Sequence, residues 1–290
     1  MKVLLTGGSG FLGGILTDTL QKDHELFSLG RSSSNTISCD LSIEIPEIPE
    51  IDMIIHSAGK AHVIPKSPEE EQEFFSVNSI GTSNLLKGIK KLPKLMVLIS
   101  TVAVYGLDEG VNIDENQALN GTTPYAKSKI QAEEIWKSWA LSNNVDFLIL
   151  RLPLIAGPNP PGNLGAMIKA IEKGYYFRMG DGQAKKSVVL ARDIAEHLPK
   201  WIGHSGVYNL TDGIHPSLKD LDSYLSHKYG KKVRSISEGL LGLISKIGDV
   251  ISVFPFNSYR HSKLKSTLTF SDLKARRELA WSPKPVIGNF

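Results

Sequence analysis

The sequence predicts an α/β fold in which a doubly wound parallel sheet, with helices on both faces, is followed by a smaller C-terminal capping region. Three observations predict it. Short apolar runs alternate with longer stretches whose apolar residues recur at helical spacing. The first run, Lys2–Thr6, leads through a glycine-rich turn directly into a helical pattern that begins at Phe11. The alternation is interrupted at residues 157–162, where prolines and glycines break any regular element.

Each element follows from this alternation. Before the interruption, apolar runs predict strands at Lys2–Thr6, Glu25–Leu29, Met53–His56, Leu95–Ser100 and Asp146–Arg151. The stretches between them predict helices over Phe11–Gln21, Pro68–Lys90 and Pro124–Ser142. Beyond it we expect helices at Leu164–Glu172 and Leu218–Lys228, and strands at Ser187–Leu190 and Val207–Leu210. We therefore place a first domain at residues 1–157 and a second region at 158–290, which contributes sheet edges to the first.

The composition limits the classes of function. The net charge of +3 over 290 residues is small and is not gathered into long runs, so nucleic acid is not an expected partner. The single cysteine, Cys39, allows no intramolecular disulfide, which fits a cytoplasmic location. The apolar stretch Leu240–Phe256 contains Lys246 and Asp249, so we expect a core or dimer-contact helix rather than a membrane span. A helix lying on a membrane surface is the minority interpretation. No metal site is expected.

The glycine-rich turn predicts a dinucleotide site. Its three glycines are spaced by two residues, directly after a strand and at the opening of a helix, and this context disfavours an ordinary glycine-rich turn. The phosphates would sit on the helix N-terminus, where free N–H groups and the helix dipole favour negative charge. The residues expected to contact the dinucleotide here are Gly7, Ser9, Gly10, Phe11, Leu12 and Gly13.

The end of the second strand favours NADP over NAD. An NAD site places a carboxylate there for the ribose hydroxyls, whereas an NADP site places an arginine for the 2′-phosphate. The chain has Arg31 followed by Ser32 and Ser33, and no acidic residue at this turn. A guanidinium and hydroxyl groups are suited to a phosphate. Asp40 and Leu41 are expected either near the adenine or, for Asp40, as the cap of a turn.

A tyrosine and a lysine on the predicted helix 124–142 indicate proton transfer. Tyr125 and Lys129 are four residues apart and share one helix face. A nearby ammonium lowers the pKa of a phenol, and such a tyrosine can exchange a proton with an alcohol oxygen while hydride moves to or from nicotinamide. The pattern is common by itself. It becomes specific with Thr101 at a strand end upstream, followed by Val104–Gly106.

Together these residues resemble the nucleotide-sugar epimerase/dehydratase group of extended short-chain dehydrogenases/reductases. The matching segments, in the order of that group, are Thr6–Gly13, His56–Gly59, Val77–Asn78, Gly81–Leu86, Ser100–Thr101, Val104–Gly106, Tyr125 with Lys129, Arg151–Pro153, Gly157–Pro158 and the weaker Leu279–Pro283. The resemblance covers nearly the whole chain. It implies an enzyme with a Rossmann-type cofactor domain and a sugar in the cleft between the two regions.

The resemblance also implies roles for individual residues. Thr101 would hydrogen-bond the reacting sugar oxygen, Tyr125 would be the acid/base, and Lys129 would bind the nicotinamide ribose and tune Tyr125. Further cofactor contacts are implied for Ser57, Ala58, Gly59, Lys60, Asn78, Ser100 and Pro153. For Asn78 a purely structural role, with its side chain bonded to backbone, is an equal alternative.

Two departures from the group narrow the expected activity. Leu154 stands where 4-epimerases of the group often carry asparagine, and the second strand lacks their acidic end. Val102 and Ala103 stand where dehydratases place acidic residues. We therefore expect NADPH-dependent reduction of a UDP-4-keto-6-deoxy-hexosamine, in the synthesis of surface polysaccharide precursors. The alternatives are a UDP-hexose or UDP-N-acetylhexosamine 4-epimerase that retains NAD, and a non-catalytic NADP-binding regulatory protein.

Basic residues of the C-terminal region are candidates for binding the substrate. In the group such residues hold the nucleotide diphosphate, and Lys186 and Lys263 are the candidates here. A solvated surface lysine is an equally good interpretation of each. Asn163, just beyond the Pro- and Gly-rich segment, is the third candidate. A UDP-linked sugar is the expected partner, and a homodimer is left open.

Overall fold

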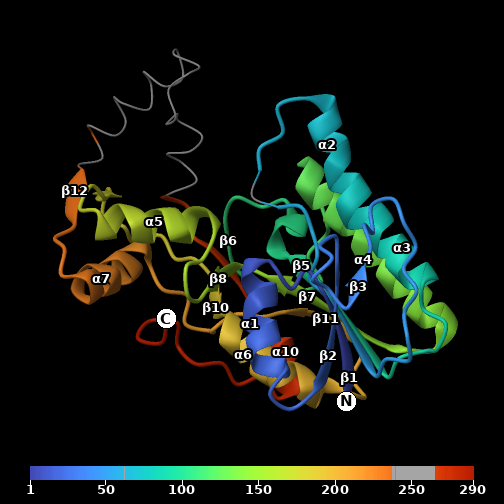
Figure 1. Ribbon diagram of the computed structural model, residues 1–290. Helices are drawn as coiled ribbons and strands as arrows, with labels where there is room; N and C mark the ends of the chain where they lie inside the picture. The colour runs from blue at the N-terminus through green and yellow to red at the C-terminus, as the bar shows by residue number, and fades with distance from the viewer. Residues whose placement is uncertain (62, 237–238, 240–264) are drawn as a thin grey trace.

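A seven-stranded parallel sheet forms the centre of the molecule, in the order β11-β7-β5-β4-β1-β2-β3. The computed structural model describes residues 1–61, 63–236, 239 and 265–290. The strands are β1 (Lys2–Thr6), β2 (Glu25–Gly30), β3 (Ile37–Ser38), β4 (Met53–His56), β5 (Leu95–Thr101), β7 (Asp146–Leu152) and β11 (Gly206–Asn209). The predicted doubly wound parallel sheet is thus confirmed (Figure 1).

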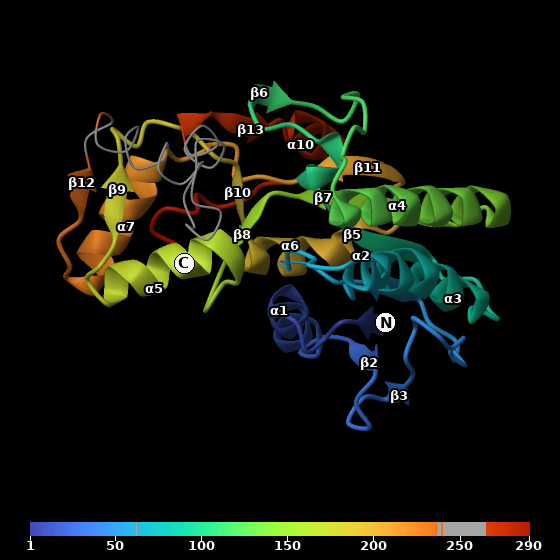
Figure 2. The same cartoon turned by 90° about the horizontal axis from the view of Figure 1, so that it is seen from above.

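Helices cover both faces of this sheet because its strands are apolar on both sides. Val3 and Leu5 of β1 belong to one buried core and Leu4 to the other, as alternating side chains require. The first core is shared with α1 (Phe11–Leu20), α6 (Ala191–His197) and α10 (Leu273–Leu279). The second is shared with α3 (Gly81–Lys87) and α4 (Pro124–Asn143), and α2 (Pro68–Phe75) packs beside α4. Figure 2 shows α1 and α4 on opposite sides of the sheet.

Among the described residues, two further α-helices and three two-stranded sheets complete the fold. The helices are α5 (Gly162–Glu172) and α7 (Leu218–Tyr229). The strand pairs are β8 (Leu154–Ala156) with β10 (Val188–Leu190), β9 (Phe177–Met179) with β12 (Arg234–Ile236), and β6 (Gly110–Ile113) with β13 (Leu268–Phe270). Figure 2 shows α5, α7, β9 and β12 set apart from the large sheet. The elements expected here are present within two residues of their predicted bounds, and β11 completes the large sheet.

The single helix expected over Pro68–Lys90 is wrong in detail. It is divided into α2, a π-helical turn over Ser76–Ile80, and α3. The turn carries Asn78, whose buried side chain makes three hydrogen bonds to groups outside the helix. These bonds hold the widened turn, and apolar periodicity does not reveal them.

The predicted helix at Leu240–Phe256 lies outside the described residues. Among the residues that are described, no helix combines the length and the apolar character needed to cross a membrane. The same part of the chain contains no group of three or more His, Cys, Asp or Glu side chains placed to hold a metal ion.

Candidate active site

The predicted dinucleotide loop joins β1 to α1 in a close-packed turn. Gly7 has φ +74°, and its carbonyl accepts a hydrogen bond of 3.0 Å from the Gly10 amide. A Cβ at Gly13 would lie 2.0 Å from the Gly7 oxygen, so no side chain fits there. No side chain caps the N-terminus of α1, its first turn holds no acidic residue, and Ser9 and Gly10 are exposed. This turn therefore offers open backbone N–H groups that fit a pyrophosphate.

The start of α1 also meets the segment that follows β8. A Cβ built on Gly157 would be 3.2 Å from the Phe11 ring. Pro153, between β7 and β8, is partly buried. The side chain of Leu12 lies in the core, so only its backbone is open to a cofactor. Phe11 and Gly157 thus come together beside the glycine loop.

The predicted cofactor loop Ser57–Lys60 is held by Asn78. The Asn78 Oδ1 accepts from the Lys60 amide at 2.8 Å, and its Nδ2 donates to the Lys60 carbonyl at 3.1 Å and to Ser128 Oγ at 2.9 Å. The Lys60 ammonium pairs with Glu73 of α2. Asn78 therefore connects this loop to α4, and both hydrogens of its amide group are used in these bonds.

A chain of buried hydrogen bonds runs beneath the same loop. The Ala58 amide donates to Thr6 Oγ1 at 3.1 Å, which lies 2.7 Å from His56 Nδ1. His56 Nε2 lies 3.0 Å from Thr82 Oγ1, which donates to the Asn78 carbonyl at 2.6 Å. Burial lowers the pKa of His56 to about 3, so the imidazole is neutral. Its two ring nitrogens join the hydrogen bonds on either side of the ring.

The Arg31 turn lies open at the end of β2. Arg31, Ser32 and Ser33 are all exposed, and Ser32 Oγ lies 2.8 Å from Ser34 Oγ. No ion pair within 4 Å engages Arg31 among the described residues. The guanidinium is therefore accessible to a ligand phosphate.

Asp40 caps a turn, which was one of its two predicted roles. Its Oδ1 accepts from the Ser42 amide at 3.0 Å and from Ser42 Oγ at 2.7 Å. These bonds, with a smaller contribution from Arg31, lower the pKa of Asp40. Leu41 is buried, and its carbonyl accepts from Asn84 Nδ2. Both residues stabilise the segment beside the Arg31 turn.

The structure brings together the predicted Thr–Tyr–Lys group. Thr101 ends β5, and its Oγ1 accepts a backbone hydrogen bond from the 3-10 turn η2 (Val102–Tyr105). Tyr125, in the first turn of α4, lies beside the Thr101 side chain, which lowers its pKa. Lys129 follows one turn later, is buried, and donates from Nζ to the Ile99 carbonyl at 2.6 Å. All three lie at the carboxyl end of β5.

The expectation that Lys129 lowers the pKa of Tyr125 is wrong for this structure. Burial raises the pKa of Tyr125, and only the Thr101 side chain opposes it. The Lys129 ammonium is directed at the Ile99 carbonyl instead, and burial lowers its own pKa to about 8 against an opposing effect of Glu133. Desolvation of the phenol therefore decides the direction, and Tyr125 is a protonated donor at neutral pH.

The sequence analysis did not predict a buried ion pair between Arg151 and Glu133, which lies next to Lys129. Arg151 of β7 donates from Nη2 and Nε to the Glu133 carboxylate of α4 at 2.7 and 3.2 Å. Arg151 Nη1 also donates to the Tyr105 hydroxyl at 3.1 Å. Ser100, a predicted cofactor contact, instead turns its hydroxyl to Glu133. The available signal was spacing, since Glu133 follows Lys129 by four residues on the same helix.

The predicted substrate residues are dispersed. Asn163 is exposed in the first turn of α5. Lys186 donates from Nζ to the Ser266 carbonyl at 2.7 Å. Lys263 lies outside the described residues. These placements leave the substrate assignments as predictions.

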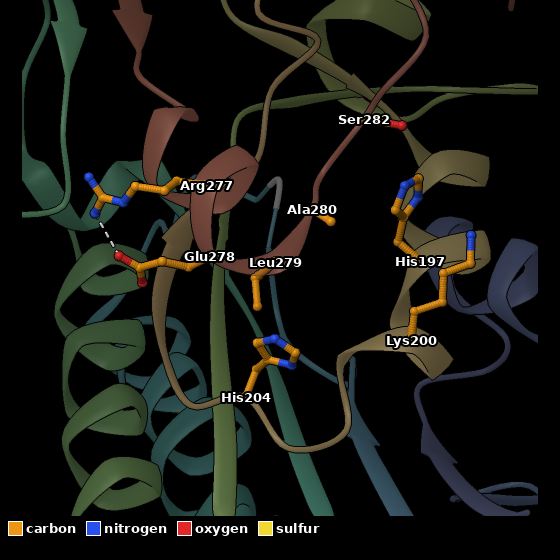
Figure 3. A pocket seen from close by; sticks show the side chains of 8 residues that line it. All are labelled: His197, Lys200, His204, Arg277, Glu278, Leu279, Ala280 and Ser282. Carbon is orange, nitrogen blue, oxygen red and sulfur yellow. Dashed lines mark hydrogen bonds and ion pairs between the residues drawn. The ribbon is translucent and has the colours of Figure 1, made fainter.

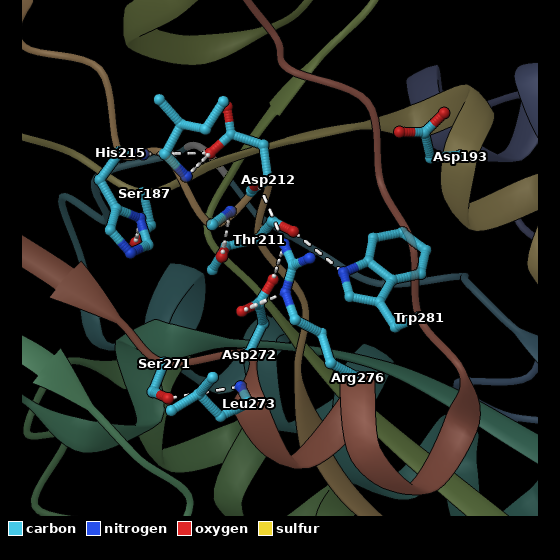
Figure 4. Close-up of polar contacts among 12 residues, drawn as sticks. Ser187, Asp193, Thr211, Asp212, His215, Ser271, Asp272, Leu273, Arg276 and Trp281 are labelled. Carbon is cyan, nitrogen blue, oxygen red and sulfur yellow. Dashed lines mark hydrogen bonds and ion pairs between the residues drawn. The ribbon is translucent and has the colours of Figure 1, made fainter.

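A polar cluster near Lys186 joins the C-terminal segments together (Figure 4). Asp212 accepts from the His215 and Val286 amides at 3.2 and 3.1 Å. Ser187 Oγ lies 3.0 Å from His215 Nδ1 but is buried and accepts from the Phe270 amide. This Ser–His contact is therefore a structural bond and not an exposed nucleophile.

A hollow of about 330 Å³ lies near the amino end of the edge strand β11 (Figure 3). It is lined by His197, Lys200, His204, Arg277, Glu278, Leu279, Ala280 and Ser282. It adjoins the amino end of β11, whereas the Thr101 group lies at the carboxyl end of β5. It is thus separate from the candidate active site.

The fold and the glycine loop define a dinucleotide-binding α/β protein. The NAD dependent epimerase/dehydratase family matches residues 3–210, and the chain belongs to this family. It is an NAD(P)-dependent enzyme of the extended short-chain dehydrogenase/reductase type, as the motifs predicted, and the non-catalytic alternative is set aside.

Similar proteins cover nearly the same length. An Escherichia coli O157:H7 protein, N-acetyl-alpha-D-glucosaminyl-diphospho-ditrans,octacis-undecaprenol 4-epimerase, is 28% identical over 94% of this chain and 88% of its own. UDP-glucuronic acid 4-epimerase from Bacillus cereus, solved with UDP-glucuronic acid and NAD, is 20% identical with a TM-score of 0.75, covering 98% and 95% of the two chains. RMD from Pseudomonas aeruginosa, solved with NADPH, is 20% identical with a TM-score of 0.72, covering 99% and 96%. Both solved structures support the fold alone.

Proposed function

We propose that this enzyme reduces the C4 keto group of a UDP-linked 6-deoxy-hexosamine with NADPH. The carrying observation is the open Arg31 turn at the end of β2, which has an accessible guanidinium, exposed serines and no carboxylate. Such a turn suits the 2′-phosphate of NADP, and a cofactor that exchanges in every cycle suits net reduction. Leu154, where 4-epimerases of the family often have asparagine, supports the same choice.

The candidate residues suit proton delivery in this direction. A bound reduced nicotinamide supplies hydride. Tyr125, protonated at neutral pH because burial raises its pKa, donates its proton to the C4 oxygen of the sugar. Thr101, beside Tyr125, donates a hydrogen bond to the same oxygen. Lys129, at the carboxyl end of the sheet, holds the cofactor ribose beside them.

A redox-neutral 4-epimerase is the second candidate. The name of the Escherichia coli relative favours it, since that protein is a 4-epimerase of a diphosphate-linked N-acetylglucosamine. An epimerase keeps its cofactor through oxidation and reduction of the sugar, whereas a reductase releases it. Retention of cofactor is therefore the property that separates the two candidates.

The test is to identify nucleotide bound to the purified protein and then to assay two reactions. We expect an empty protein that oxidises NADPH only with a UDP-4-keto-6-deoxy sugar. Retained NAD⁺, with conversion of UDP-N-acetylglucosamine or UDP-glucose to the galacto isomer without added cofactor, would establish the epimerase instead.

Arg31→Ala tests the cofactor preference. Because a charge-assisted bidentate pair to phosphate is lost, we expect the Kd for NADPH to rise about 10-fold or more while that for NADH is unchanged. Arg277→Ala, at an exposed arginine of α10, is the matched control. Equal affinity of Arg31→Ala and wild type for NADPH would rule out a role for Arg31 at the 2′-phosphate.

A further inference from the structure

We propose that Glu133 is the buried acidic neighbour and positioning residue of Lys129, and that Arg151 holds its carboxylate in place. The proposal deepens the proposed function, because it rests on Lys129 acting in that reaction. Glu133 touches neither sugar nor cofactor in this scheme. It acts through the lysine one turn before it on α4 and through β5, to which both side chains are bonded.

Two bonds between α4 and β5 fix the geometry of the site. Lys129 Nζ donates to the Ile99 carbonyl at 2.6 Å, and the next residue, Ser100, donates its hydroxyl to Glu133. Thr101 comes directly after. A helix bonded to two successive residues of a strand cannot slide along it without breaking both bonds. Glu133 and Lys129 therefore set the position of Tyr125 relative to Thr101.

Arg151 pairs with Glu133 in a buried place. Glu133 and Arg151 are 4% and 5% exposed, and burying a charged group is costly unless it is paired. The guanidinium donates hydrogen bonds to both carboxylate oxygens, and its Nη1 donates to the Tyr105 hydroxyl. Tyr105 in turn donates to Asn209 Oδ1 at 2.7 Å. The pair thus ties α4 to β7, η2 and β11.

The charge of Glu133 is the feature that matters to Lys129. Burial lowers the pKa of Lys129 to about 8, and Glu133 is the charged group that opposes this. His56 of β4 also faces Lys129 but is neutral. The titratable groups around the lysine are His56 from β4 and Tyr125 and Glu133 from α4. Arg151 from β7 is paired with Glu133, and Tyr105 from η2 is bonded to Arg151. Removing the carboxylate charge therefore removes the group that opposes the effect of burial on the pKa of Lys129.

The experiment titrates Lys129 directly in the full-length protein. Lysine labelled with ¹³C at Cε gives a pKa by NMR, and Lys129→Arg assigns the signal. Glu133→Gln leaves Arg151 buried without its charged partner and is at risk of not folding, so the double variant Glu133→Gln/Arg151→Met removes both charges together. In either variant we expect the pKa of Lys129 to fall by about one unit or more, and the alkaline limb of the kcat/KM profile to move down with it.

Glu134→Gln is the matched control, because Glu134 is the exposed neighbour on the same helix, and it should leave both readouts unchanged. A folded double variant with the wild-type pKa of Lys129 would overturn the proposal and leave Glu133 a purely structural role. The NMR readout needs no substrate. Failure of the proposed function would appear separately, as a lowered pKa of Lys129 in a protein that reduces no keto-sugar.

Discussion

At the scale of single residues, the site pairs a phenol whose pKa is raised with an ammonium whose pKa is lowered. Both directions have one cause, since burial penalises the charged form of each group. The two side chains therefore sit closer to neutrality than their free counterparts. Neutral Tyr125 suits a proton donor.

Tyr125→Phe should lower turnover by about 10²- to 10⁴-fold, because the proton donor is lost while the ring remains. The ring packs against Phe74, with centroids 6.2 Å apart, so the fold should persist. NADPH binding, measured by fluorescence titration, should change little. Thr101→Ser, which keeps a hydroxyl, is the conservative comparison and should retain most activity. A Tyr125→Phe enzyme with near wild-type kcat would exclude Tyr125 as the acid.

At the scale of elements, the sequence was sufficient where local pattern decides the structure. Strands buried on both faces and the glycine turn were predicted because apolar runs and glycine spacing determine them. The π-turn at Asn78 and the Glu133–Arg151 pair were not, because they depend on partners 18 residues apart or more. Roles for Ser100 and Lys60 rested on resemblance, and their side chains turned to Glu133 and Glu73.

Gly13→Ala tests the element-level fit of α1 on the glycine loop. Its Cβ would lie 2.0 Å from the Gly7 oxygen, so the helix or the loop must move. We expect cofactor affinity to fall by about 10-fold or more, with a loss of stability of about 1–3 kcal/mol. Gly14→Ala is the control on the same helix, since its Cβ has no atom nearer than 3.8 Å. It should be neutral or stabilising by up to about 1 kcal/mol. Urea unfolding and NADPH titration provide the two measurements.

At the scale of the whole molecule, the polar interior connects elements from both halves of the chain. The His56 chain joins β1, β4 and α3, and the Arg151 pair joins α4, β7, η2 and, through Tyr105, β11. Buried polar groups of this kind specify one arrangement because every alternative leaves them unpaired. They also make stability depend on pH wherever one member titrates.

His56 should make the protein less stable in mild acid. Its pKa is about 3 when folded and about 6.5 when unfolded, so the unfolded chain binds the extra proton between these values. The stabilisation is complete above pH 6.5 and is lost progressively as pH falls towards 3. Between pH 7.5 and 5.5, wild type should lose about 1.4 kcal/mol more unfolding free energy than His56→Gln.

Urea unfolding at the two pH values measures this difference, and His227→Gln, at an exposed position on α7, is the control that should track wild type. Equal losses in wild type and His56→Gln would mean that the imidazole is protonated in the folded protein.

The pairing of β11 with β7 also has a consequence for biosynthesis. Residues 206–209 lie against residues 148–151, and until they emerge from the ribosome β7 is an edge strand with unsatisfied backbone groups. A nascent chain ending near residue 157 would hold the complete glycine loop and the Thr–Tyr–Lys group but an open sheet. Such an intermediate is prone to pairing with another chain, and the order of synthesis makes this exposure unavoidable for about 50 residues of elongation.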